Sequence, residues 1–184
     1  MNGQGTSGER FLGWLQDLKG KASWRAARAA LRRSLAFDPG AYPPAMPYVE
    51  PFFRGTGDEG WRRQAYYLVA GLYALRDGEH RGGRSLAQAL YEVRQKRGSE
   101  SVEKRFLALL DADRDQIAYR LRQAVLLVEG PLDFARLLDD LMGWFHASRR
   151  VQARWAREFY GTGQGKEEAA LEGQASGNKE EVTE

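Results

Sequence analysis

Apolar residues recur at helical spacing along most of this chain, and that periodicity is what most limits its fold. Between Ser23 and Ala36, for example, Trp24, Ala27, Leu31 and Leu35 fall on one face of a helix. No segment alternates apolar and polar residues between hairpin turns over the length of a strand, so we expect no sheet of consequence. The sequence therefore predicts an all-α protein.

The helices are expected to form a compact, two-lobed bundle of about eight or nine helices. Proline-rich residues 37–50 interrupt the pattern and are predicted to form an extended loop. We assign residues 7–97 to an N-terminal helical lobe and residues 98–160 to a C-terminal helical lobe. Residues 161–184 are rich in Gly, Glu, Gln and Ser with almost no apolar content, so we expect a disordered acidic tail.

Several helix boundaries carry capping signals. Ser7 is expected to open the first helix, and Ser85 with Gln88 forms the capping-box pattern before another. Asp113 and Asp133 each precede an apolar run, where a carboxylate can accept backbone N–H groups of the first turn. These signals place the helix starts independently of the apolar periodicity.

The net charge of +3 conceals a basic body and an acidic end. The last 24 residues hold two lysines and six glutamates, which leaves a net charge of +7 on residues 1–160. The cations of that body are 22 arginines and four lysines. Arginine binds phosphate bidentately and stacks on bases, which favours a nucleic-acid partner. A compositional preference for arginine, as in proteins of hot habitats, explains the composition equally well, so position has to decide.

The predicted helix after Ser23 carries the most informative basic residues. Arg25, Arg28 and Arg32 share an arc beside its apolar face, with Arg33 further round, and no acidic residue lies between Ser23 and Phe37. Pairs within the helix cannot neutralise these charges, so a polyanionic partner is the favoured explanation. The alternative is a solvated face whose acidic partners come from elsewhere in the fold.

Two other arginines are not expected to bind phosphate. Arg114 lies on the apolar side of its helix start, which favours a structural ion pair. Arg154 precedes Trp155 near the end of the predicted bundle and is expected on the surface.

Nothing in the sequence points to catalysis. The chain has no cysteine and only two histidines, His80 and His146, so we expect no metal site and no cofactor. An enzyme would need a pocket with convergent polar groups, for which the surroundings of His146 are the candidate. No apolar stretch of signal-peptide or membrane-spanning type occurs, so a soluble, cytoplasmic, non-enzymatic protein is expected.

The ordered set of motifs resembles CasB, the small-subunit family of the type I-E CRISPR surveillance complex Cascade. The resemblance covers about residues 8–160 and rests on residues 48–52, 85–90, 104–114, 121–122 and 132–134, followed by Leu141 and Trp144. It implies an all-α, two-lobed, non-catalytic protein that occurs as two copies beside the guide-RNA backbone filament. Members help to hold the target DNA and the displaced strand when the R-loop opens.

The resemblance also implies which basic residues contact nucleic acid. They correspond to Arg32 or Arg33, Arg105, Arg122 and the pair Arg149 and Arg150. Together with the helix of unpaired arginines, the predicted nucleic-acid-binding residues are Arg25, Arg28, Arg32, Arg33, Lys104, Arg105, Arg122, Arg149 and Arg150. The expected partners are single-stranded and R-loop DNA, the backbone and large subunits of the crRNA-containing complex, and a second copy of the chain. A helical scaffold or adaptor without nucleic-acid contact is the alternative function.

Overall fold

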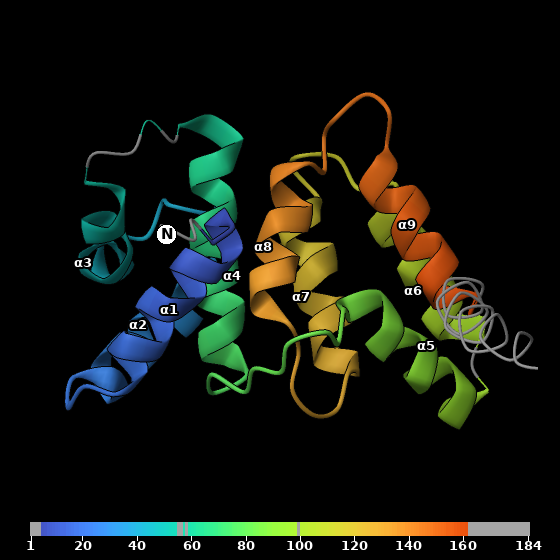
Figure 1. Ribbon diagram of the computed structural model, residues 1–184, viewed down its shortest axis with the longest axis horizontal. Coiled ribbons are helices and arrows are strands. Elements are labelled where there is room, and N and C mark those ends of the chain that lie inside the picture. Colours follow the sequence, from blue (N-terminus) through green and yellow to red (C-terminus); the bar gives the residue numbers. More distant parts are fainter. Residues whose placement is uncertain (1–4, 55–56, 58, 99, 162–184) are drawn as a thin grey trace, which may run out of the picture.

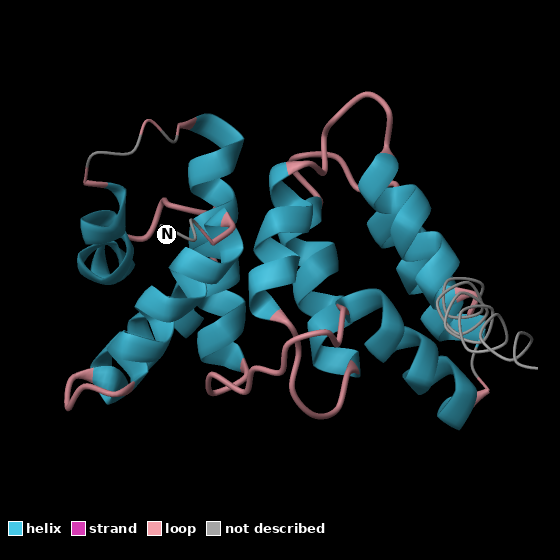
Figure 2. Cartoon of the chain, in the orientation of Figure 1, coloured by secondary structure: helices cyan, strands magenta, loops and turns pink. Residues whose placement is uncertain are grey.

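The computed structural model describes residues 5–54, 57, 59–98 and 100–161, and over these it is built almost entirely from helices (Figures 1 and 2). Strand-like pairing within these ranges is limited to an isolated bridge between His80 and Leu132. The prediction of an all-α protein is confirmed. Of the predicted tail, residues 162–184 lie outside the described part.

Within the described ranges there are nine α-helices and two short 3-10 turns. In chain order they are α1 (Ser7–Lys19), α2 (Trp24–Ser34), η1 (Pro43–Ala45), α3 (Met46–Val49), η2 (Glu50–Phe53), α4 (Gly60–Leu75), α5 (Leu86–Arg97), α6 (Glu100–Leu110), α7 (Ile117–Leu127), α8 (Phe134–Met142) and α9 (Arg150–Phe159).

Helix α4 is the centre of the N-terminal half and is buried over most of its length. Helix α2 packs on one side of it and α8 on another, while α1 packs against α8 (Figure 1). Two glycines permit these close approaches. A Cβ on Gly71 would lie 3.1 Å from the carbonyl oxygen of Leu31, and a Cβ on Gly8 would lie 2.0 Å from the carbonyl oxygen of Ala135. The backbones of α2 and α4, and of α1 and α8, are therefore in near contact.

The other helices pack around α5, which contacts α6, α7 and α9. Aromatic pairs fill the space between them: Phe106 stacks on Phe159 with ring centroids 4.0 Å apart, and Trp144 meets Trp155 edge to face at 5.0 Å. Helix α8 joins the two groups, since it packs against α1 and α4 and its Arg136 and Asp140 form hydrogen bonds with α9. The division of the chain into lobes between residues 97 and 98 stays a prediction.

The predicted caps agree with the structure at α5 and α8 but not at α1 and α7. Ser85 and Gln88 form a capping box at α5, and Asp133 accepts a hydrogen bond from the backbone N–H of Arg136 at α8. At α1 the cap is Thr6, not Ser7, in a second capping box with Glu9. Thr6 satisfies the same requirement for a hydroxyl acceptor, one residue earlier. At α7 the N-cap is Gln116, and the Asp113 carboxylate instead accepts hydrogen bonds from the backbone N–H groups of Asp115 and Gln116 in the turn before the helix.

The prediction of an extended loop over residues 37–50 is wrong for its second half. The chain forms η1, α3 and η2 between Pro43 and Phe53. Each of these short elements has a proline at its first or second position. Proline breaks a helix interior, but its fixed φ suits the first helical turn, so these prolines begin helical turns instead of preventing them.

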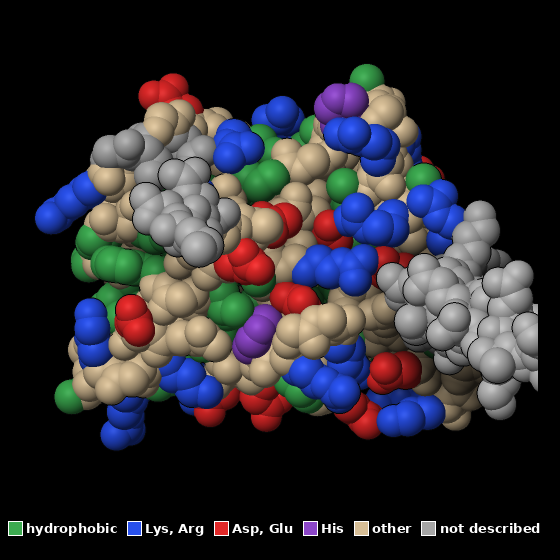
Figure 3. Space-filling model, viewed as in Figure 1, with side chains coloured by type: hydrophobic (Ala, Val, Ile, Leu, Met, Phe, Trp, Pro, Cys, Tyr) green, Lys and Arg blue, Asp and Glu red, His purple; other side chains and the backbone are tan. Residues whose placement is uncertain are grey.

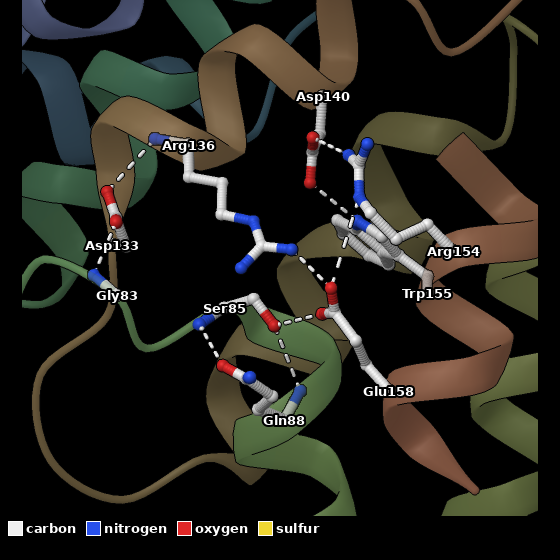
Figure 4. Close-up of polar contacts among 9 residues, drawn as sticks. All are labelled: Gly83, Ser85, Gln88, Asp133, Arg136, Asp140, Arg154, Trp155 and Glu158. Carbon is white, nitrogen blue, oxygen red and sulfur yellow. Dashed lines mark hydrogen bonds and ion pairs between the residues drawn. The ribbon is translucent and has the colours of Figure 1, made fainter. Parts of the chain in front are cut away.

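A polar cluster connects α8, α9 and the start of α5 (Figure 4). Asp140 is 5% exposed, and its carboxylate accepts hydrogen bonds from Arg154 and from the indole of Trp155. Burial raises the pKa of Asp140 above its ordinary value, against the smaller opposing effects of Trp155, Arg154 and Arg136. Arg154, expected on the surface, keeps 40% of its side chain exposed, but pairing with this carboxylate covers the rest.

Glu158 continues the cluster from α9. Its carboxylate accepts hydrogen bonds from Arg136 of α8 and from the hydroxyl of Ser85, the α5 cap. Ser85 thus contributes both to its own helix and to the contact with α9, although the sequence indicates only the first role. These contacts fix the C-terminal helices relative to one another.

Candidate nucleic-acid interface

The arginines of α2 line two adjoining hollows. The first is bounded by Trp24, Arg25, Arg28, Ala29, Arg32 and Asp77, and the second by Ala29, Arg32, Arg33, Ala36, Leu75 and Arg122. Because Ala29 and Arg32 belong to both, the hollows form one continuous depression, which we call the α2 groove. Five of the nine predicted binding residues therefore lie together.

Arg122 reaches the α2 groove from the opposite wall, since it belongs to α7. Its Nε is buried and has no hydrogen-bond acceptor among the described residues. A buried guanidinium N–H without an acceptor costs free energy, about 1–3 kcal/mol for a typical buried donor. The site is thus electrostatically and chemically suited to an anion between α2 and α7.

Only one arginine of α2 has an acidic partner in the described part of the chain. Nε of Arg28 lies 3.0 Å from Oδ1 of Asp77 and also donates to the carbonyl oxygen of Ala74. Arg25, Arg32 and Arg33 are exposed and form no ion pair within the described ranges. The adaptor alternative requires acidic partners for all four, and the fold supplies one.

Two predicted residues on α6, Lys104 and Arg105, do not line the α2 groove. Nζ of Lys104 lies 2.8 Å from Glu100, one turn away, and both side chains are largely exposed. An exposed pair of this kind contributes little to stability. Arg105 is exposed, with no ion-pair partner among the described residues.

Arg149 and Arg150 lie at the start of α9 and also stand apart from the groove. Arg149 has a left-handed backbone with φ of 49°, and its side chain donates to the carbonyl oxygen of Leu110 and to Asp111. These bonds attach the loop before α9 to the end of α6. Arg149 thus has a structural role that the sequence did not indicate, while Arg150 is exposed.

The sequence pattern also missed two features of the basic surface. Asp77 joins the α2 groove from the loop after α4, a placement that depends on how α4 packs against α2. Arg114, expected to form an ion pair, instead has its guanidinium 5.1 Å from the centroid of the Phe145 ring. Its neighbour is thus an aromatic face, which stabilises a cation through the ring quadrupole.

His146, the residue named for a catalytic alternative, has only local contacts. Its Nδ1 lies 2.8 Å from the hydroxyl of Ser148 and accepts a hydrogen bond from the Ser148 backbone N–H. Both residues are exposed, and no carboxylate is hydrogen-bonded to His146 within the described ranges. The described residues also contain no group of three or more His, Asp or Glu side chains placed to hold a metal ion.

Basic and acidic side chains are interspersed over the face of the molecule drawn in Figure 3. Elsewhere in the fold several arginines are paired, as in the Asp140 and Glu158 cluster. The α2 groove differs, because its basic residues outnumber its one acidic residue, Asp77. No helix in the described part of the chain is long and apolar enough to span a membrane.

Comparisons with known proteins agree on one family. The family model for CRISPR-associated protein Cse2 matches residues 27–160. A curated CRISPR-associated protein Cse2 of Thermus thermophilus is 67% identical over 171 residues, covering 91% of this chain and 98% of the relative.

Solved structures of similar proteins share the fold. The crystal structure of CasB from Thermus thermophilus has a TM-score of 0.82 at 66% identity, covering 85% of this chain and 99% of that one. CasB of M. ruber has a TM-score of 0.71 at 35% identity, with coverage of 87% and 97%. A chain of a CRISPR RNA-guided surveillance complex has the same fold, with a TM-score of 0.67 at 23% identity and coverage of 89% and 96%. This chain belongs to the CRISPR-associated Cse2 family, whose members are also called CasB.

Proposed function

We propose that this protein is the non-catalytic small subunit of the type I-E CRISPR surveillance complex, Cascade, and that its α2 groove binds nucleic-acid phosphates. The family supports the place in the complex, since a chain of the same fold occurs in a CRISPR RNA-guided surveillance complex. In that assembly the subunit contacts the backbone and large subunits and a second copy of itself.

The observation that carries the binding proposal is the α2 groove itself. Arg32 and Arg33 from α2 and Arg122 from α7 line one hollow, and none has an acidic partner in the described part of the chain. A phosphodiester oxygen can accept from the Arg122 Nε–H and at the same time offset the repulsion among the guanidinium groups. An anionic backbone is therefore the ligand that this chemistry suits.

The proposed role is to stabilise separated strands through contacts with their backbones. Exchange of a DNA duplex for an RNA–DNA heteroduplex is nearly balanced in free energy. Protein contacts to the strand backbones can therefore shift the equilibrium toward the open R-loop. Arginines on rigid helices contact phosphates without reading bases, which gives affinity with little sequence preference. The subunit would thus hold the target and displaced strands and stabilise the R-loop during antiviral defence.

The direct test is binding of the full chain to single-stranded DNA and to RNA of the same sequence over a salt series. We expect affinity to fall linearly on a log-log plot, with a slope of roughly −0.7 for each phosphate contact. Arg33→Glu and Arg122→Ala should weaken binding and flatten that slope. Lys96→Glu on α5 is the control for a charge change, because Lys96 is exposed and lies outside the groove.

Two results would refute the groove as the binding site. One is an affinity that does not change with salt. The other is an equal loss in Lys96→Glu and in the groove variants, which would indicate a general charge effect. In the assembled complex, unchanged R-loop stability with both Arg33→Glu and Arg122→Ala would favour the adaptor function instead.

A further inference from the structure

Helix α7 exposes an aromatic side chain beside the α2 groove. Tyr119 is 62% exposed, the highest value among the large hydrophobic residues of the described part. Leu126, two helical turns further on, is 51% exposed. Positions 119, 122 and 126 have i, i+3 and i+7 spacing, so Arg122 lies on the same face of α7. Tyr119 therefore lies on the face of α7 that carries Arg122, next to the residues that line the second hollow but not among them.

The neighbours of Tyr119 on α7 show which way this face of the helix points. Ala118, the residue before Tyr119, faces the end of α2, where it lines a small hollow with Leu35 and Phe37. Arg122 follows it by one turn and lines the groove itself. Tyr119 is displaced from Ala118 by about 100° around the helix, away from α2 and toward solvent. It thus stands at the outer edge of the basic site.

The other exposed aromatic residues in the described part of the chain, Phe37 and Tyr160, are already engaged in contacts within the protein. Phe37 is 44% exposed, but its ring stacks on Tyr42 with centroids 4.7 Å apart. The hydroxyl of Tyr160 donates a hydrogen bond to Glu103, and its ring lies beside Arg94. Tyr119 has no hydrogen bond, ion pair or ring contact within the described ranges, and its exposed ring surface is available to a ligand.

We propose that Tyr119 stacks on a base of a single strand whose phosphates lie in the α2 groove, so that the site prefers single-stranded nucleic acid to duplex. This inference rests on the proposed function and adds to it a binding residue and a preference for single strands over duplex. Single-strand sites commonly pair a basic groove with an aromatic platform, because any base can stack on an aromatic ring. A duplex keeps its base faces inside the stack, so it cannot use Tyr119.

The charge around Tyr119 selects a nucleic acid over an apolar protein surface. Arg32, Arg33 and Arg122 lie beside this face with no acidic partner among the described residues. An apolar partner covering Tyr119 would have to desolvate those guanidinium groups without compensation, which is costly. A single strand supplies both a phosphate for the arginines and a planar base for Tyr119.

The experiment compares Tyr119→Ala and Tyr119→Phe with Leu126→Ala, a control that removes an apolar side chain from the same face. Each full-length variant is titrated with a single-stranded DNA, with the same strand carrying abasic nucleotides, and with the matching duplex. Arg33→Glu is measured in parallel as the variant that removes a phosphate contact.

We expect Tyr119→Ala to weaken binding of the intact strand by about 5- to 100-fold, the range of one base–aromatic stack. Binding of the abasic strand and of the duplex should change by less than about two-fold. Tyr119→Phe and Leu126→Ala should retain normal affinity, and the salt slope of Tyr119→Ala should not change, because no phosphate contact is lost.

The outcomes separate this inference from the function on which it rests. If Arg33→Glu weakens binding and Tyr119→Ala does not, the groove binds phosphates and the stacking inference is wrong. If Tyr119→Ala weakens binding of the abasic strand as much as the intact one, its effect is structural and the inference is also overturned. If neither variant affects binding, the proposed function itself fails.

Discussion

The indole N–H of Trp155 donates a 2.6 Å hydrogen bond to Oδ2 of Asp140, and both residues are buried. Arg154, the preceding residue, pairs with the other oxygen of the same carboxylate. Two consecutive residues of α9 therefore depend on one acidic side chain of α8 (Figure 4). Because both oxygens of this carboxylate are engaged from α9, Asp140 limits the rotation and register of α9 against α8.

Replacement of Asp140 by leucine should destabilise the protein by about 3 kcal/mol, the cost typical of breaking a buried ion pair. The variant keeps the branching of the side chain but removes the acceptor of the Trp155 indole and a charge partner of Arg154. Urea unfolding followed by tryptophan fluorescence measures the change. Asp17→Leu, at an exposed position of α1, should stay within about 0.5 kcal/mol. Equal effects of the two variants would contradict the assigned role.

The stability difference between the wild type and Asp140→Asn should depend on pH. Burial raises the pKa of Asp140 above 3.8, so the folded state holds this proton more tightly than the unfolded state does. The contribution is complete below pH 3.8 and is lost as pH rises through the folded-state pKa. Asparagine does not titrate, so the wild type should lose stability relative to the variant as pH rises above 3.8. A flat or opposite difference in unfolding free energy would contradict this prediction.

Gly8 and Gly13 on α1 should respond oppositely to alanine. A Cβ at Gly8 would meet the backbone of Ala135 at 2.0 Å, whereas a Cβ at Gly13 has open space within 4 Å. Gly8→Ala should therefore separate α1 from α8 and cost about 1–3 kcal/mol, as overpacking does. Gly13→Ala should be stabilising by roughly 0.5–1 kcal/mol, because alanine is the better helix former. Thermal unfolding of both variants checks the pair, and a similar shift in each would show that the contact is not tight.

Asp77→Asn should increase the affinity of the α2 groove for single-stranded DNA. The change removes the one carboxylate of the groove and releases Arg28 from its ion pair. Asparagine tolerates the left-handed backbone of this position, where φ is 52°. A gain of roughly two- to five-fold at low salt is expected, matching the energy of an exposed pair, and it should shrink as salt rises. Asp17→Asn is the control for net charge, and an equal gain there would contradict a local effect.

Much of the fold could be predicted because its signals are local. The caps at Ser85 and Asp133 and the apolar faces of α2 and α4 follow from spacing along a single helix. The turns between Pro43 and Phe53 could not, because a proline marks both the end of one helix and the first turn of the next. Only the packing of Val49 and Phe53 into the core decides between these two interpretations.

The candidate site could be predicted only in part, for the same physical reason. The four arginines of α2 lie in one short segment, so the sequence pattern predicts them as a set. That Arg122 faces them across the groove, and that Asp77 neutralises Arg28, depends on the packing of α4 and α7. Arg149 carries an equally strong basic signal, but its loop geometry directs it to Asp111 and Leu110.

The two walls of the α2 groove belong to segments far apart in the chain, with Arg33 on α2 and Arg122 on α7. An anion held between them acts as a non-covalent crosslink that closes a long loop of the polypeptide. The unfolded chain cannot form this link, so the ligand stabilises the folded state in proportion to the logarithm of its concentration. Occupancy of the groove would then be measurable without any label, as a rise in the unfolding temperature and as slower digestion by proteases.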